Sequence, residues 1–399
     1  MTASVDTASP QARTRTASLA ALIAARTAAD VLVRTPTRAM LGRGGLTGRA
    51  ADVRRGALAE DVRSLASADR TCGGSGIVLG AIPFADGGAV NLQVPDELWL
   101  ADPAGAVGDP GRTAAGGWHA RTVPSRAVYA AAVDAAVAAI ERSELVKVVL
   151  ARALDLRPER PYRHDELVRH LLRALLHRQA GDHVFAVPLA AGRTLVGASP
   201  ELLVERHGMR IRAVPLAGSA PRSADPGVDR RNAEQLLASI KARHEHAVVV
   251  AAVTDALAPH CQALEVPDTP SLVRTPTMWH LATRVRGRVP AAGAGALDLA
   301  LALHPTPAVC GTPPAAARLA IGQLEPFDRG FFAGAVGWSD ADGNGEWSVT
   351  LRCAEVRDDV VRLFAGAGVV AGSIGAEEAS ETSDKFRTML DALGADERS

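Results

Sequence analysis

The chain has 399 residues, with 44 basic and 44 acidic side chains and 47% hydrophobic residues. This length is ample for a buried core, and the zero formal net charge argues against a dedicated nucleic-acid-binding protein. No apolar run approaches the roughly 18 residues that span a membrane. The four cysteines lack metal-ligand spacing and indicate a reducing compartment, so we expect a cytoplasmic protein that binds neither nucleic acid nor membrane.

The predicted elements begin with helix and change to strand near residue 76. Residues 1–17 are rich in Ala, Ser, Thr and Arg and predict a flexible tail, which leaves 18–399 as the folded domain. In chain order, the first half predicts an Ala/Arg-rich helical segment over 18–65, strands over 76–84 and 97–101, a helix over 126–142, a strand over 145–150 and a helix over 165–179.

The second half of the chain mixes strands with long helices. It predicts strands over 183–187, 194–197, 202–206 and 209–214, a long helix over 232–258, a Pro-bearing loop over 305–314, a helix over 315–324, strands over 346–356 and 360–365, and a helix over 376–393. Long helices beside many strands indicate an α+β fold. No clear linker divides the chain after residue 70, so we expect one large domain.

Lysine is rare in this chain, where arginine supplies nearly all the positive charge. Only Lys147, Lys241 and Lys385 are present. Lysine can lose its proton when it is buried, whereas arginine effectively cannot. Lys147 lies within the apolar run Leu-Val-Lys-Val-Val-Leu, where burial would lower its pKa toward the range of a general base. The alternative is an edge-strand lysine that extends to water.

Glu201 follows Gly-Ala-Ser-Pro at a turn between two predicted strands. Pro200 restricts the backbone there, so the glutamate projects from a constrained loop. If the carboxyl is partly buried, its pKa is raised and it can act as a general acid. The alternative is an ordinary turn residue.

Acidic residues on two predicted helices could hold a metal ion. Glu245 has apolar helical neighbours, so its carboxylate needs a partner, either a metal ion or Lys241 one turn away. Glu378, Glu381 and Lys385 are three and four residues apart and share one helix face. Two carboxylates on one stripe suit magnesium, whereas the alternative is a solvated face with a Glu–Lys pair.

The last two strands carry a candidate binding site for an anion. Alternation along 346–356 places Ser348, Thr350 and Arg352 on one face, and arginine matches a carboxylate bidentately. The alternative is a solvent-facing sheet surface. The run Ala365-Gly-Ala-Gly368 lacks the full dinucleotide spacing but would allow a ligand to approach backbone N–H groups.

Nine short segments, several of which include these residues, follow one another along the chain in an order typical of one enzyme family. They are Lys147-Val-Val-Leu-Ala-Arg152, Gly197-Ala-Ser-Pro-Glu201, Pro215-Leu-Ala-Gly-Ser219, Arg243-His-Glu-His246, Thr275-Pro-Thr-Met-Trp-His280, His304-Pro-Thr-Pro-Ala308, Glu325-Pro-Phe-Asp328, Gly343-Asn-Gly-Glu-Trp347 and Ala365-Gly-Ala-Gly368. With them the chain resembles the chorismate-utilising enzymes, the family of isochorismate, salicylate, anthranilate and aminodeoxychorismate synthases. The resemblance covers residues 75–395, and the ordered set is highly specific.

The resemblance implies a fold and a set of roles. The fold is a single α+β domain of the anthranilate and aminodeoxychorismate synthase type, a sheet sandwich with flanking helices. Lys147 matches the base that activates water for attack at C2 of chorismate, and Glu201 matches the acid that protonates the departing 4-hydroxyl. Glu245 and Glu381 match the direct ligands of Mg²⁺, with Glu378 behind them. The substrate-binding positions match Gly218, Ser219, His280, Ala308, Val309, Phe332, Arg352, Gly366 and Lys385.

Two positions separate the branches of the family. Lys147 stands where water-using members carry their base, and Ala217 stands where aminodeoxychorismate synthases carry a nucleophilic lysine. The overall likeness favours the siderophore-type isochorismate synthases, which are isomerases that supply salicylate or 2,3-dihydroxybenzoate biosynthesis. The alternative is a salicylate synthase, which goes on to eliminate pyruvate. Water as the nucleophile implies no amidotransferase subunit, and we expect a monomer.

One residue departs from the family pattern. The family usually has an acidic residue one turn before the metal-binding glutamate of this helix, where this chain has Ala242. Loss of a group that supports a metal ligand typically weakens a site about 10- to 100-fold. We therefore expect weaker magnesium binding than is usual in the family. A catalytically weak chorismate-binding protein is a further alternative, which the presence of Lys147, Glu201, Glu245 and Glu381 opposes.

Overall fold

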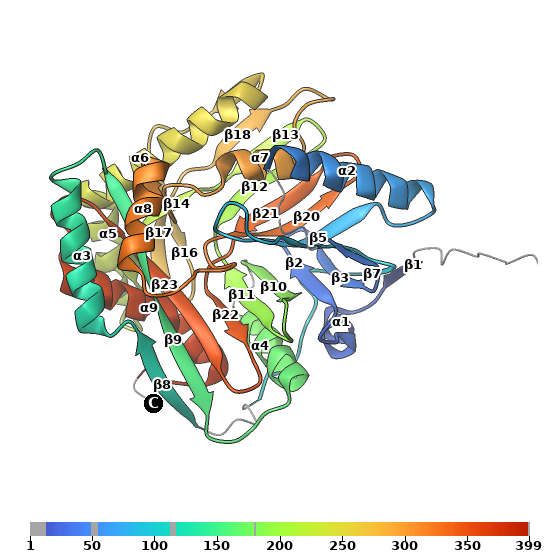
Figure 1. Cartoon of the computed structure of the whole chain (residues 1–399), viewed down its shortest axis with the longest axis horizontal. Coiled ribbons are helices and arrows are strands. Elements are labelled where there is room, and N and C mark those ends of the chain that lie inside the picture. The colour runs from blue at the N-terminus through green and yellow to red at the C-terminus, as the bar shows by residue number, and fades with distance from the viewer. Residues whose placement is uncertain (1–12, 49–54, 112–116, 179–180, 398–399) are drawn as a thin grey trace, which may run out of the picture.

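The structure is a computed structural model that describes residues 13–48, 55–111, 117–178 and 181–397. In this part of the chain the strands form three sheets (Figure 1). The largest, with 11 strands, contains in spatial order β1 (Arg13–Thr16), β7 (Glu97–Ala101), β3 (Ala39–Arg43), β2 (Val31–Arg34), β10 (His183–Pro188), β11 (Thr194–Ser199), β22 (Cys353–Val356), β23 (Val361–Val369), β9 (Lys147–Pro158) and β19 (Gly311–Thr312), with β8 (Trp118–Val123) also paired to β9.

The other two sheets differ greatly in size. A 9-stranded sheet contains β15 (Ala263–Glu265), β18 (Val285–Arg288), β13 (Arg210–Ala213), β12 (Leu202–His207), β21 (Gly345–Val349), β20 (Ala335–Asp340), β5 (Ile77–Ile82), β6 (Asn91–Val94) and β4 (Leu46–Gly48). A 3-stranded sheet contains β14 (Leu216–Pro221), β17 (Met278–Ala282) and β16 (Ser271–Arg274).

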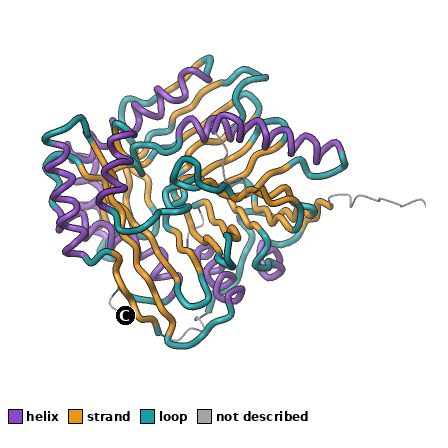
Figure 2. The backbone as a smooth tube through the Cα atoms, viewed as in Figure 1, coloured by secondary structure: helices purple, strands orange, loops and turns teal. Residues whose placement is uncertain are grey.

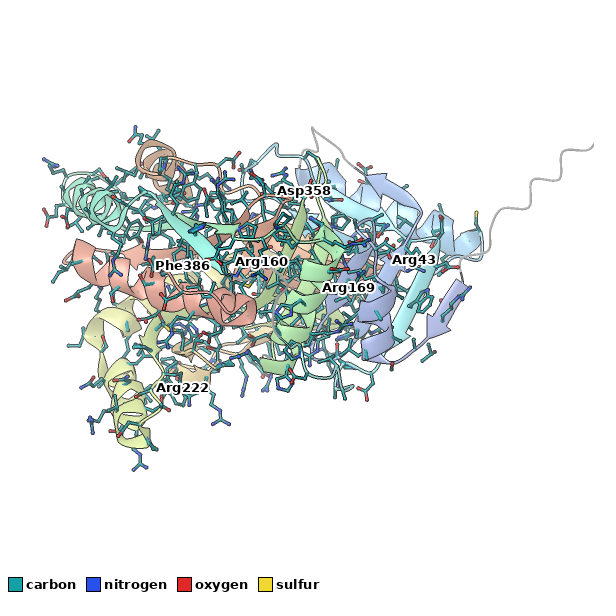
Figure 3. All side chains as sticks on the ribbon, turned by 90° about the horizontal axis from the view of Figure 1, so that it is seen from below. Arg43, Arg160, Arg169, Arg222, Asp358 and Phe386 are labelled. Carbon is teal, nitrogen blue, oxygen red and sulfur yellow. The ribbon has the colours of Figure 1, made fainter. Side chains whose placement is uncertain are left out.

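Helices cover the outer faces of the sheets (Figure 2). They are α1 (Leu19–Ala25), α2 (Arg55–Thr71), α3 (Arg126–Ile140), α4 (His164–Arg178), α5 (Pro226–Ala238), α6 (Ile240–Leu257), α7 (Ala296–Leu303), α8 (Pro314–Leu324) and α9 (Gly375–Leu393), with a 3₁₀ turn at Ala258–His260. No helix in the described ranges is long and apolar enough to cross a membrane. In Figure 3, Phe386 marks α9 and Arg222 marks the chain that leaves the 3-stranded sheet.

Strand alternation divides the core into two layers. Along β2, Val31 and Val33 join the cluster between the two large sheets, whereas Leu32 joins the cluster under α1, α4 and α9. Leu79 of the 9-stranded sheet belongs to the same inter-sheet cluster as Val33. Burial of apolar side chains on both faces explains why the strands of the 11-stranded sheet read as continuous apolar runs.

Several predicted elements have different boundaries in the structure. The helical prediction over 18–65 is wrong for its centre, where β2 and β3 form an antiparallel pair between α1 and α2. Within the predicted flexible tail over 1–17, residues 1–12 lie outside the described ranges, and Arg13–Thr16 form an edge strand parallel to β7. The helix predicted over 232–258 is two helices that meet at Ser239, whose hydroxyl accepts a hydrogen bond from the Ala242 N–H at 3.2 Å and caps α6.

The strand predicted over 346–356 is also two strands, and they belong to different sheets. β21 lies in the 9-stranded sheet and β22 in the 11-stranded sheet. Between them Arg352 has a φ of 48°, in the left-handed region that interrupts a strand. The prediction that Ser348, Thr350 and Arg352 share one strand face is therefore wrong, because the alternation ends before Arg352.

Candidate active site

The three sheets meet around one cavity. It holds about 800 Å³ of empty space, counting the part that is open to solvent, which suits a small-molecule ligand. All the predicted site residues except Glu378 line it: Lys147, Glu201, Gly218, Ser219, Glu245, His280, Ala308, Val309, Phe332, Arg352, Gly366, Glu381 and Lys385. Side chains separated by more than 200 residues in the chain thus face one space.

Lys147 is the first residue of β9 and is 2% exposed. Burial lowers the pKa of its amine, Glu245 opposes that shift, and Lys385 adds to it. Gly368, paired with Val149 on the neighbouring strand, leaves the room that Lys147 needs. A Cβ at Gly368 would lie 3.1 Å from Cε of Lys147 and 3.3 Å from Oε2 of Glu245.

Glu201 lies where the chain passes from β11 in one large sheet to β12 in the other. Its side chain is 3% exposed, and burial raises its pKa to about 8, although the N–H of Leu216 and the amines of Lys147 and Lys385 favour the charged form. The Leu216 N–H donates to Oε1 at 3.4 Å. At neutral pH this carboxyl is therefore protonated and can donate a proton.

Three further carboxylates gather on one side of the cavity. Burial raises the pKa of Glu245, and the neighbouring Glu381 raises it further. Burial and Glu381 likewise raise the pKa of Glu378, which does not line the cavity itself. For Glu381 burial acts in the raising direction, but Lys385 and Ser219 outweigh it and its pKa is lowered. Burial thus disfavours the ionised forms of two of the three carboxylates, whereas a lysine holds the third in its ionised form.

Both remaining lysines bind these carboxylates. Nζ of Lys241 lies 2.9 Å from Oε1 of Glu378, so the expected alternative of a Lys241–Glu245 pair is replaced by a contact between α6 and α9. Nζ of Lys385 lies 2.6 Å from Oε1 of Glu381, as the i,i+4 spacing predicts, and also donates to the Gly366 carbonyl at 2.8 Å. The Ser219 hydroxyl donates to Oε1 of Glu381 at 2.9 Å and joins β14 to α9.

The chemistry of these carboxylates fits a hard divalent cation. Within the described ranges, no three acidic, histidine or cysteine side chains are already arranged as a metal site, because lysines hold two of the carboxylates. Burial and the neighbouring Glu381 raise the pKa values of Glu245 and Glu378, so added positive charge beside them would favour their ionised forms. Carboxylate oxygens in this arrangement are the donors that magnesium takes.

Arg352 faces the cavity from the segment between β21 and β22, and His280 faces it from β17 of the 3-stranded sheet. Arg352 is 8% exposed, burial lowers its pKa to about 10, and its guanidinium donates to the Lys385 carbonyl at 2.9 Å. His280 is 6% exposed, and burial together with the nearby Arg352 and Lys385 lowers its pKa, so its ring is neutral. Its Nε2 is buried without a hydrogen-bond partner among the described residues and is available to a ligand.

The remaining predicted residues form the cavity wall. Gly218 has a φ of 78°, and a Cβ there would lie 3.0 Å from that of Ala242, so glycine is required at this close approach. The Phe332 ring stacks on Phe364 with centroids 5.2 Å apart. Other wall residues lie within the segments quoted above but had no predicted binding role: Val149, Pro200, Leu216, Ala217, Ala365 and Gly368. Sequence reasoning missed four more: Arg329, Ala333, Leu351 and Phe364. The position of Arg329, one turn after Glu325, was the signal that could have identified it.

Comparison with known proteins identifies the relatives of this chain. Residues 110–394 match the family model described as chorismate binding enzyme. Isochorismate synthase DhbC of Bacillus subtilis is 50% identical over 323 residues, which are 80% of this chain and 81% of that protein. The crystal structure of DhbC from Bacillus anthracis has 43% identity and a TM-score of 0.87, and the match covers 94% of this chain and 98% of that one.

A more distant structure bears on the fold alone. Anthranilate synthase component I from Streptococcus pneumoniae is 23% identical with a TM-score of 0.58, over 68% of this chain and 59% of that one. Together with the sheets and covering helices described above, these likenesses confirm the predicted α+β fold of the anthranilate synthase type, with one large domain.

Proposed function

This chain belongs to the chorismate-binding enzyme family and is an isomerase that converts chorismate to isochorismate, and on that premise we propose how its own residues perform the reaction. Lys147 is the general base and Glu201 the general acid. Arg352, His280, Lys385 and the wall of the cavity bind and orient the substrate. The likeness to DhbC supports a place in siderophore biosynthesis, through 2,3-dihydroxybenzoate or salicylate.

The observation that carries the proposal is the pair of opposite pKa shifts in one cavity. Burial lowers the pKa of Lys147 and raises that of Glu201 to about 8. An amine that releases its proton more easily accepts one from water, and a carboxyl that stays protonated can donate one. Two titratable groups whose environments shift their pKa values in this way define the acid and the base of a reaction.

The proton balance follows from these two roles. A water molecule forms its C–O bond at C2 of the ring and loses one proton to Nζ of Lys147. The C4–O bond breaks as the carboxyl of Glu201 gives its proton to the departing hydroxyl, which leaves as water. The ring double bonds shift between these positions, one water enters and one leaves, and the reaction is an isomerisation without net oxidation. Because water and not ammonia is the nucleophile, we propose that the enzyme needs no amidotransferase subunit. We also propose that it is a monomer.

Binding of two substrate carboxylates accounts for the charges of the cavity. We assign the pyruvyl carboxylate to Arg352 and the backbone of Gly366, with Lys385 beside them, because a buried guanidinium requires an anion. We assign the ring carboxylate to Mg²⁺ held by Glu245 and Glu381, with Glu378 supporting them. When bound, the ion supplies positive charge that neutralises the ring carboxylate beside the acidic residues. Four free cysteines fit a reducing compartment, and we propose a cytoplasmic location.

Product analysis tests this function. Purified enzyme is incubated with chorismate and magnesium, and the products are identified by liquid chromatography with mass detection. The proposal expects isochorismate in equilibrium with chorismate and no release of pyruvate. Salicylate with equimolar pyruvate would reassign the chain to the salicylate synthases, and substrate binding without any product would make Ala242 the first position to repair.

A further inference from the structure

We propose that the buried ion pair of Glu325 and Arg329 is a positioning device for catalysis, which takes the place of a missing strand beside β9 and fixes the segment that carries Lys147. This inference rests on the proposed function, since it assumes that Lys147 acts in the cavity. Both side chains are 2% exposed. They lie on the loop after α8. Arg329 also lines the cavity, but neither residue is an acid, a base or a metal ligand in the mechanism above.

The edge of β9 has a gap at the residues that follow Lys147. β19 pairs with β9 only at Lys147 and Val148, and β8 pairs only from Ala153 onward. The Val149 N–H still donates to the Cys310 carbonyl at 2.8 Å, but the Val149 carbonyl and the Ala151 N–H have no strand partner on this edge. Buried N–H and C=O groups need partners, so this stretch requires hydrogen bonds from another source.

The ion pair supplies the hydrogen bonds of the missing strand. Nη2 of Arg329 donates to the Val149 carbonyl at 2.7 Å. Oε1 of Glu325 accepts from the Ala151 N–H at 2.8 Å. The two side chains also bind each other, with Nε of Arg329 2.9 Å from Oε2 of Glu325. The carbonyl of Val149 and the N–H of Ala151 are thus paired with a donor on Arg329 and an acceptor on Glu325, and the contact between these two side chains fixes their spacing.

Arg329 also holds the part of the cavity wall that follows β9 on the neighbouring chain segment. Its Nη1 donates to the Val309 carbonyl at 2.7 Å, and Val309 is a wall residue. Its guanidinium lies 4.5 Å from the centre of the Phe84 ring and 5.9 Å from that of Phe332, another wall residue. One side chain therefore connects the strand of the catalytic lysine with the surface against which the substrate packs.

The hydrogen bonds of the pair satisfy buried backbone groups and so support the fold, but its two charges do not by themselves explain the arrangement. A buried ion pair contributes little net stability, because removing both charges from water offsets their attraction, and apolar residues of similar size often serve as well. Arg329 lines the cavity, but among the described residues its guanidinium is engaged by Glu325 and by the carbonyls of Val149 and Val309, so we treat it as a positioning residue. The pair fixes the position of β9 at Val149, only two residues after Lys147. An error of about 1 Å in the position of a catalytic group can lower a rate about 100-fold.

The test compares turnover with folding in two variants. Arg329→Lys keeps the charge but loses the planar fork, and the double variant Glu325→Gln with Arg329→Met removes both charges at once. We measure kcat and KM for chorismate together with the thermal unfolding temperature. Both variants are expected to lose kcat by about 10- to 100-fold, while KM changes by less than about threefold because the groups that bind the substrate are intact.

Arg206→Lys is the matched control. Arg206 is 4% exposed and, like Arg329, donates to backbone carbonyls, those of Gly208, Ala291 and Ala294. It does not line the cavity. Its substitution is expected to lower the unfolding temperature and to leave kcat per folded enzyme unchanged.

Three results would overturn the inference, and a fourth would contradict the proposed function. Wild-type kcat in folded Arg329→Lys or in the folded double variant would overturn the inference, as would an equal loss of kcat in Arg206→Lys. Failure of both variants to fold would also overturn it, because the pair would then serve the fold and not the placement of Lys147. Absence of isochorismate with the wild-type enzyme would instead contradict the proposed function itself.

Discussion

Lys147 and Glu201 show how burial alone prepares an acid and a base. Each side chain is almost inaccessible to water, which disfavours the charged form and so shifts an amine and a carboxyl in opposite directions. The sequence predicted both shifts from an apolar strand and a constrained turn. It could not predict the charges that modify the shift of Lys147, since Glu245, which opposes it, and Lys385, which adds to it, approach the amine only in the folded chain.

Substitution of Lys147 tests the role of its amine. Lys147→Ala is expected to lower kcat at least about 100-fold, because general-base catalysis contributes about 10²- to 10⁴-fold. Lys147→Arg retains the positive charge but cannot release a proton at neutral pH, so it is expected to be equally inactive. Steady-state kinetics and chorismate binding by calorimetry are measured for both. An active arginine variant would show that Lys147 supplies charge and not basicity.

The raised pKa of Glu201 gives a pH dependence with a defined sign. The carboxyl is protonated below about pH 8 and ionises as the pH rises through that value, so the acid form and the activity are lost on the alkaline side. We expect kcat/KM to fall above about pH 8, and Glu201→Gln to be inactive at every pH. Glu205→Gln, outside the cavity on β12, the strand that follows Glu201, is the control and should keep the profile of the wild type.

At the scale of elements, the sequence identified most helices but missed many strands, among them the whole 3-stranded sheet. It also merged elements that change direction without glycine or proline. Ser239 gave no clear signal within 232–258, because serine is tolerated in a helix and its use as a cap depends on the break itself. Arg352 likewise gave no signal for the change of sheet within 346–356. The Ala/Arg-rich composition of 18–65 favoured helix, whereas tertiary pairing made Val31–Arg34 a strand.

The contact between α6 and α9 determines the magnesium prediction. Lys241 on α6 binds Glu378 on α9, and Ala242 beside it leaves no acidic group at a position where the family usually has one. Ala242→Asp is expected to lower the half-saturating magnesium concentration about 10- to 100-fold. The measurement is a titration of activity and of binding heat with magnesium.

Ala247→Asp provides the matched control for this prediction. Ala247 lies on the exposed face of α6, so an added carboxylate there remains in solvent. Its half-saturation point should equal that of the wild type. If Ala242→Asp also leaves the half-saturation point unchanged, the acidic residue of the family pattern is not what sets magnesium affinity in this chain.

For the molecule as a whole, the site exists because the chain crosses between sheets beside one cavity. Glu201 lies at the crossing from β11 to β12, and Arg352 lies at the return from β21 to β22. Sequence patterns report the period of a single strand and contain no information on which sheet the next strand joins. The family resemblance, and not the strand pattern, therefore brought Arg352 into the predicted site.

Gly197 tests how tightly these crossings are packed. A Cβ at this position would lie 2.6 Å from Cζ of Phe185, 2.7 Å from Cβ of Cys353 and 2.9 Å from the Arg352 carbonyl. Gly197→Ala is expected to lower the free energy of unfolding by about 1–3 kcal/mol through overpacking, and to lower kcat because Glu201 and Arg352 both shift. Urea unfolding and kinetics measure the two effects.

Gly322 is the control position for the Gly197 substitution. Gly322 lies within α8, and a Cβ there would meet no atom within 4 Å. Gly322→Ala is therefore expected to raise the stability by about 0.5–1 kcal/mol without any effect on kcat. Equal effects of the two substitutions would show that the crossing beside Gly197 has room to adjust.

The central claim is that solvent water, activated by Lys147, becomes the new hydroxyl at C2. The most direct test is to run the reaction with magnesium in ¹⁸O-labelled water and to locate the label in the product by mass spectrometry. The account predicts one labelled oxygen at C2 of isochorismate formed by the wild type, and no labelled product from Lys147→Ala. Isochorismate without the label would mean that the hydroxyl migrates within the substrate, and the assignment of Lys147 as the base for water would be contradicted.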